Sequence, residues 1–173
     1  SERAGAVIQR LRALFNKSGH EQTVLQINDI IQETLDVLGS EVVLKAVLTQ
    51  VHLEPTLPRV LGNRIELQQV VLNLLVNAME AMSENEPGQR QLQITTRCED
   101  TRELHVSVRD SGPGIREQPI SRLFEAFFTT KATGMGMGLA ICQSIIVAHR
   151  GRLQAVNNPD RGATFQVTLP SHH

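Results

Sequence analysis

The segment from Arg64 to Ser83 constrains the fold most, because it carries the strongest helical periodicity in the chain. Its apolar side chains recur at spacings of three and four residues, which predicts a helix that buries one broad face. Asn63 stands directly before it and is a candidate N-cap. A helix of this kind must pack against a second layer of structure. The apolar face consists of Leu67, Val70, Val71, Leu74, Leu75, Ala78 and Met82.

The other elements alternate between helices and paired strands. Segments of alternating hydrophobicity are separated by short charged or Pro- and Gly-containing turns, which predicts antiparallel hairpins. The order predicts an α+β fold with a layer of helices on one face of a sheet. We expect strands at Thr23–Ile27, Ala46–Leu53, Val60–Leu61, Gln91–Cys98, Leu104–Asp110, Arg152–Val156 and Ala163–Leu169, and helices from a cap at Asn28-Asp29 to about Gly39 and from Met137 to His149, the latter with Gly151 at its C-terminal cap.

Composition excludes several classes of protein. A net charge of -1 over 173 residues and the absence of Trp and Tyr remove the basic field and the stacking platforms on which nucleic-acid binding depends. Cys98 and Cys142 are too few for a disulfide framework or a structural zinc cluster. No apolar run approaches the ~18 residues of a membrane-spanning helix. We therefore expect a cytoplasmic domain that contacts neither nucleic acid nor a membrane.

A polar stripe runs along the helix that follows Asn63. Asn73, Asn77 and Glu80 recur at spacings of four and three residues, so they share one face. Two interpretations are open: the three residues form a solvated stripe on an amphipathic helix, or they form a binding site. Asparagine is a poor residue for a helix interior, and an amide oxygen can complete the oxygen shell of Mg²⁺ beside phosphates and water.

Asp110 ends a row of apolar residues on one predicted strand. Alternation places it on the same face as Val106 and Val108, whereas His105 faces the other way and is predicted to be a surface histidine. A buried carboxylate requires hydrogen-bond donors. Gly112 follows and lets the backbone approach a flat ligand, so an acceptor for the amine of adenine is one interpretation. A tight Asp-Ser-Gly turn is the other.

A glycine-rich stretch precedes the last helix. Gly134, Gly136 and Gly138 would present free N–H groups to an anion at the helix N-terminus, with the charge of Lys131 nearby. The spacing fits neither a phosphate loop of the GxxxxGK[ST] kind nor a dinucleotide-binding fingerprint. Taken alone, the stretch also reads as a flexible loop.

These motifs, in this order, resemble the catalytic ATP-binding domain of bacterial sensor histidine kinases, in the GHKL superfamily. VVLNLLVNAMEAM, VRDSGPGI, LFEAFFTTK and GMGMGLAI are similar to the N, G1, F and G2 boxes of that family. The resemblance extends over roughly residues 19–170 and is strongest for the subgroup with NAMEAM and FFTTK. It implies a two-layer α/β sandwich with a mixed, mostly antiparallel sheet covered by helices, and it implies ATP and Mg²⁺ as cofactors.

The resemblance also implies roles for single residues. Asn77 would hold magnesium and, with Asn73 and Lys131, form the catalytic set. Asp110 would bind the adenine amine, with Thr164 nearby through water. The family often carries Lys or Arg where Glu80 stands, which leaves the basic phosphate contact to Lys131 or Arg122. A lid would run from about 116 to 133, anchored by Phe124 and Phe127. The remaining nucleotide-binding residues implied by the match are Gly112, Gly114, Ile115, Gly134, Gly136, Met137, Gly138 and Leu139.

The first residues of the chain resemble a segment outside the catalytic domain. ERAGAVIQRLRALFNK resembles the end of the second helix of a dimerization and phosphoacceptor hairpin, so residues 1–18 are assigned to that hairpin and 19–171 to the catalytic domain. His172-His173 is interpreted as the remnant of a purification tag. The phosphoacceptor box is absent, and His20 is interpreted as a linker residue.

The implied function is transfer of the γ-phosphoryl group of Mg-ATP to a histidine on the hairpin of the same or a partner chain. The phosphoryl group would pass on to the receiver domain of a response regulator, and the full-length protein would be a homodimer. One alternative is a GHKL-type ATP hydrolase, which is disfavoured because that class places a Glu base where Asn73 stands. The other is a nucleotide-binding module without catalysis.

Overall fold

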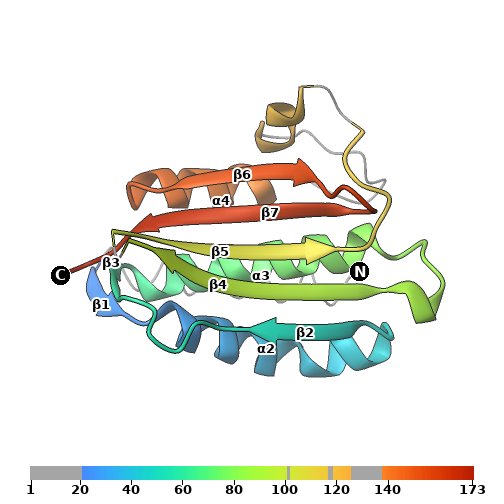
Figure 1. Cartoon of the computed structure of the whole chain (residues 1–173), viewed down its shortest axis with the longest axis horizontal. Helices are drawn as coiled ribbons and strands as arrows, with labels where there is room; N and C mark the ends of the chain where they lie inside the picture. The colour runs from blue at the N-terminus through green and yellow to red at the C-terminus, as the bar shows by residue number, and fades with distance from the viewer. Residues whose placement is uncertain (1–20, 101, 117–118, 126–137) are drawn as a thin grey trace.

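The computed structural model describes residues 21–100, 102–116, 119–125 and 138–173. Its centre is a five-stranded sheet of order β2-β4-β5-β7-β6, in which only β2 and β4 run parallel (Figure 1). A second, two-stranded antiparallel sheet joins β1 and β3 at one end of the domain. The strands are β1 Thr23–Leu25, β2 Leu48–His52, β3 Val60–Gly62, β4 Gln91–Glu99, β5 Glu103–Asp110, β6 Arg152–Asn157 and β7 Ala163–Pro170.

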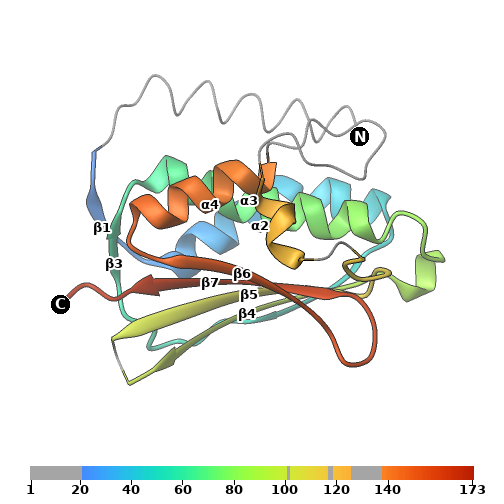
Figure 2. The ribbon, with the colours of Figure 1, turned by 90° about the horizontal axis from the view of Figure 1, so that it is seen from above.

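Three helices lie side by side over one face of the large sheet, and α3 lies between the other two (Figure 2). The expected α+β, two-layer sandwich is therefore confirmed. No helix among the residues that the structure describes is long and apolar enough to cross a membrane. The helices are α2 Ile27–Leu44, α3 Arg64–Ala81 and α4 Gly138–Ala148, with short 3-10 turns η1 Pro87–Gln89 and η2 Ile120–Phe124.

The central helix, α3, is buried on more of its surface than its sequence pattern predicts. The expected apolar face is buried, and so are Leu72, Val76 and Met79 on its other sides, because α2 and α4 flank the helix. The predicted cap is confirmed: the Asn63 side chain accepts a hydrogen bond from the Glu66 amide at 3.0 Å. This helix is the core around which the site is built.

The predicted boundaries of α2 are wrong at both ends. The helix begins at Ile27, and Gln26 caps it by accepting from the Asn28 amide, while Asn28 donates its side-chain amide to Glu54 O at 2.8 Å. It continues past Gly39 because Val42 still packs against the core there. It ends with Ala46 in the left-handed region, at φ 52°.

We expect Gly39→Ala to stabilise the domain. Gly39 lies inside α2, and a methyl group there would meet no atom within 4 Å. Alanine in a helix interior is favoured over glycine by roughly 0.5–1 kcal/mol, which raises the thermal midpoint by about 1–4 °C for a domain of this size. Thermal unfolding followed by circular dichroism measures the shift. Gly62→Ala is the contrasting variant, because its methyl group would lie 2.7 Å from the His149 ring; a lower midpoint for Gly39→Ala would contradict the expectation.

Two further expectations are corrected. The residue in the left-handed region after α4 is Arg150, at φ 63°, and Gly151 is instead required because a side chain there would overlap Thr168 O on β7. His105 is buried rather than exposed, with Nδ1 3.0 Å from the Thr168 hydroxyl. Strand β5 lies inside the sheet between β4 and β7, so neighbouring side chains cover even the open face at this position.

Candidate functional site

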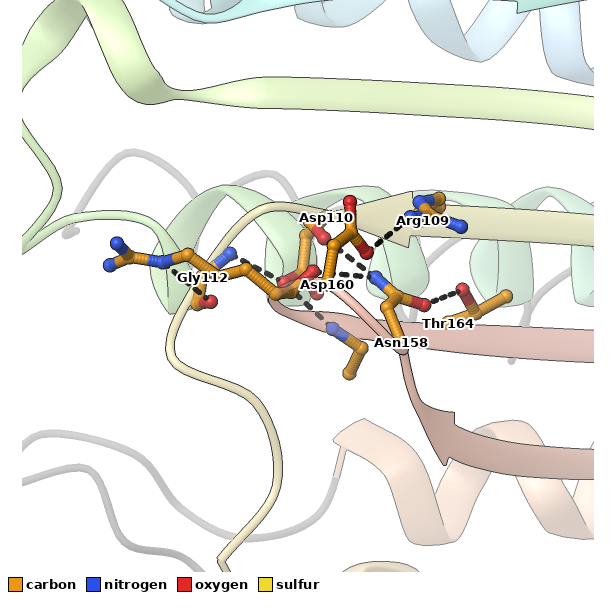
Figure 3. A network of polar contacts seen from close by, with 8 residues as sticks. Arg109, Asp110, Gly112, Asn158, Asp160 and Thr164 are labelled. Atoms are coloured by element: carbon orange, nitrogen blue, oxygen red, sulfur yellow. Dashed lines mark hydrogen bonds and ion pairs between the residues drawn. The ribbon is translucent and has the colours of Figure 1, made fainter.

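Asp110 is a buried carboxylate at the end of β5. It is 3% exposed, and its Oδ1 accepts hydrogen bonds from the amides of Gly112 at 2.9 Å and Ala163 at 3.3 Å (Figure 3). Burial raises the pKa of this carboxyl above its ordinary value of 3.8, and the two hydrogen bonds act in the opposite direction. Asp110 is buried like Val106 and Val108, which confirms the predicted alternation of β5. The strand therefore ends in a buried hydrogen-bond acceptor.

The backbone around Asp110 is packed too closely for side chains at three glycines. A methyl group on Gly112 would lie 2.8 Å from Ala81 O, at the end of α3. Gly114 and Gly162 have φ values of +89° and +85°, and a side chain at Gly162 would overlap Asp110 O. The backbone of the loop after β5 therefore lies directly against α3 on one side and against the β6–β7 turn on the other.

Asn73, in the middle of α3, is a second buried polar residue. It is 4% exposed, and its Nδ2 donates to Gly138 O at the start of α4, 3.3 Å away. Its Oδ1 is buried and has no hydrogen-bond partner among the residues that the structure describes. The interpretation of the stripe as a solvated face is therefore wrong for Asn73. Asn77 and Glu80, further along the stripe, are half-buried. A buried acceptor without a partner among the described residues is available to accept a hydrogen bond from a ligand.

The remaining predicted residues fall into two groups. Gly138 and Leu139 form the start of α4, and Thr164 lies on β7, where its hydroxyl donates to Asn158 Oδ1 at 2.5 Å. Ile115 lies in the loop after β5, and Phe124 packs edge-on against Phe165, with ring centroids 6.4 Å apart. Lys131, Gly134, Gly136, Met137, Phe127 and most of the predicted lid lie outside the described residues, as do residues 1–18 and His20.

Sequence reasoning missed the residues that hold the loop after β5. Three side chains contact the backbone of that loop: Asn157 at the end of β6, and Asn158 and Arg161 in the turn that follows. The sequence Asn-Asn-Pro-Asp predicts a turn, and its side chains have no signal that distinguishes them from ordinary turn residues. Only the meeting of two loops far apart in the sequence reveals them.

The described residues combine a two-layer α+β sandwich with a buried carboxylate at the end of β5, and comparison with known proteins identifies the family of this domain. The profile of the family described as histidine kinase-, DNA gyrase B-, and HSP90-like ATPase matches residues 62–173. The chain therefore belongs to this family.

Individual relatives narrow the similarity to sensor histidine kinases. The chain is 41% identical over 170 residues to the sensor protein TdiS of Thauera aromatica, covering 98% of this chain and 31% of TdiS. It superposes on the catalytic domain of histidine kinase ThkA with a TM-score of 0.78 at 32% identity, covering 87% of this chain and 96% of that one. A structure of ThkA in complex with response regulator protein TrrA gives 0.77 at 27% identity, with 99% and 48% covered. The chain spans about a third of the length of the curated relatives that it matches first.

Proposed function

We propose that this chain binds Mg-ATP and transfers its γ-phosphoryl group to a histidine on a hairpin helix, as the catalytic domain of a sensor histidine kinase. The buried carboxylate of Asp110 carries this proposal. One of its oxygens is held by backbone amides, which orients the group to accept a hydrogen bond from the exocyclic amine of adenine. The motif match assigns Gly112 to the same end of the site, and Thr164 lies on the neighbouring strand for a contact through water.

The phosphate end is assigned to the stripe on α3 and to the start of α4. The open, buried Oδ1 of Asn73 fits a ligand that donates or carries positive charge, and Asn77 lies one turn further along the same face. We assign Mg²⁺ to Asn77 and Asn73 to the phosphate side of the same helix, where its Oδ1 would accept from a water ligand of the ion, since phosphate oxygens cannot donate. Among the described residues no cluster of three His, Cys, Asp or Glu side chains could hold a metal, so amide and phosphate oxygens would have to supply the ligands. When bound, the ion would neutralise charge on the transferred phosphoryl group.

The motif match adds the residues between the two loops. We propose that Lys131, Gly134, Gly136, Met137, Gly138 and Leu139 surround the phosphates, and that Gly114 and Ile115 border the base. Hydrolysis is disfavoured because Asn73 has an amide where a hydrolase of this superfamily has a carboxylate base. An amide cannot take a proton from water, so transfer to a positioned histidine is the better-supported reaction.

The relatives of this chain support a proposal for its interaction partners. ThkA has been solved in complex with a response regulator protein, and we propose a receiver domain of that class as the final phosphoryl acceptor. We further propose that residues 1–18 belong to a phosphoacceptor hairpin, that the whole protein is a homodimer, and that this domain works in the cytoplasm.

Incubation of this chain with Mg-ATP is expected to leave all its histidines unphosphorylated. His20 is the one histidine followed by an acidic residue, Glu21, but it comes after Ser18-Gly19 and is interpreted as a linker residue. Addition of the hairpin that carries the phosphoacceptor box should yield acid-labile phosphohistidine on the hairpin, with ADP as the second product. Radiolabel transfer from γ-labelled ATP measures both outcomes, and Asn77→Ala serves as the control without transfer. Label on His20, or none on the hairpin, would contradict the proposal.

A further inference from the structure

The turn between β6 and β7 holds the loop that follows β5 through side-chain contacts to its backbone. The turn comprises residues 157–162, with the last residue of β6 included, and the loop comprises 110–115, with the last residue of β5 included; more than forty residues separate the two in the sequence (Figure 3). Three side chains of the turn reach three different residues of the loop. Each contact is to a main-chain group, so it depends on where the loop backbone runs and not on the side chains of the loop.

Asn157 makes the most complete of these contacts. Its Oδ1 accepts from the amide of Ile115 at 2.6 Å, and its Nδ2 donates to the carbonyl of the same residue at 3.0 Å. The side-chain amide thereby replaces the main chain of a paired strand. Gly114 directly precedes this point, and a methyl group there would lie 2.9 Å from Asn157 Oδ1. Asn157 therefore fixes both the position and the direction of the end of the loop.

Asn158 holds the start of the same loop. Its Nδ2 donates to Asp110 O at 3.1 Å and to Arg161 O at 2.9 Å, while its Oδ1 accepts from the Thr164 hydroxyl. The backbone amide of Asn158 donates to Gly162 O at 2.8 Å and closes the turn. Asn158 thus ties the backbone of Asp110 to the side chain of Thr164, which is also assigned to the adenine end, and to the backbone of Gly162.

Arg161 reaches the middle of the loop. Its Nε donates to Gly112 O at 3.2 Å, and one terminal nitrogen donates to Asn85 Oδ1 at 3.1 Å. Asn85 is 6% exposed and donates to Ser111 O at 2.8 Å. The guanidinium therefore joins the loop to the segment that follows α3.

We propose that Asn157, Asn158 and Arg161 are positioning residues that preform the adenine-binding loop before nucleotide arrives. This inference rests on the proposed function, because it assigns the loop to the base of ATP. Ordering a loop segment when a ligand binds lowers affinity, so contacts that order it beforehand increase affinity. The contacts lie at the base and not at the phosphates, so ATP and ADP should depend on them equally.

The test compares Asn157→Ala with Gln154→Ala in the 173-residue chain. Both variants remove an exposed amide side chain from β6, and Gln154 lies on the same strand three residues earlier. Asn157→Ala is expected to raise the Kd of Mg-ADP and of Mg-ATP by about tenfold each, and to abolish the hydrogen-exchange protection of the Ile115 amide in the nucleotide-free protein. Gln154→Ala should leave all three quantities unchanged. Calorimetry and hydrogen exchange read by NMR supply the measurements.

The outcomes separate positioning from a merely structural role. A lower melting temperature with unchanged Kd for both nucleotides would show that Asn157 only stabilises the fold, and would overturn the proposal. Unchanged protection of Ile115 would overturn it as well. If the wild-type chain binds no adenine nucleotide, the proposed function fails and the positioning role falls with it, although the loss of Ile115 protection would still show the contact itself. Asn158→Ala provides a second variant and should affect both nucleotides equally.

Discussion

Asp110→Asn is expected to lower the affinity for ATP by about 100-fold while leaving the nucleotide-free domain at least as stable as wild type. The substitution replaces a carboxylate oxygen with an amide that can only donate, so the adenine amine would meet a donor. Hydrogen bonds to charged groups contribute about 1.5–3 kcal/mol, which corresponds to the expected loss. The oxygen that accepts from Gly112 and Ala163 is retained, so the loop keeps its anchor. Calorimetry and thermal unfolding measure the two effects.

The stability part of this prediction depends on pH. The pKa of Asp110 is raised by burial, so the folded state binds the proton more tightly than the unfolded chain does. The ionised carboxylate therefore costs stability above the raised pKa, and this cost disappears as the pH falls through that pKa. Asparagine carries no charge at any pH. The advantage of Asp110→Asn should be largest at neutral pH and shrink in acid; a variant that melts well below wild type at neutral pH would contradict this account.

Gly162→Ala is expected to destabilise the domain by about 3 kcal/mol or more. Gly162 combines a left-handed backbone, at φ +85°, with a position where a side chain would overlap Asp110 O. Either the turn must rearrange or β7 must move away from β5, and both changes disturb the amide of Ala163 that donates to Asp110. Denaturant unfolding measures the free energy of unfolding.

Gly88→Ala is the matched control for that experiment. Gly88 is exposed in η1, is not among the glycines with positive φ, and has nothing within 4 Å of the added methyl group. It should change the free energy of unfolding by no more than about 0.5 kcal/mol. Equal stability of both glycine variants would contradict the role assigned to Gly162.

The parts of the site that depend on local pattern could be predicted from the sequence. The alternation in β5 predicted that Asp110 faces the core, and the residue type before α3 predicted the Asn63 cap. Both depend only on a few adjacent residues, for which strand and helix geometry determine direction. The order of four short motifs added the family, which no single motif establishes.

The parts that depend on packing between distant elements could not be predicted. Asn73 is buried because α4 begins against it, and His105 is buried because β7 lies beside it. Helix α2 continues past Gly39 because the core extends under it, which overrides the weak helix propensity of glycine. Asn157 and Asn158 have the sequence features of turn residues, and only their contacts with the loop after β5 give them a role.

A calorimetric titration of the wild-type chain with ATP and with GTP, each in the presence and absence of Mg²⁺, tests the central claim most directly. Adenine carries an amine where guanine carries a carbonyl oxygen, and a carboxylate can accept only from the amine. The account predicts one ATP bound per chain, tighter with Mg²⁺, and at least about 100-fold weaker binding of GTP. Equal binding of the two nucleotides, or no binding of either, would contradict it.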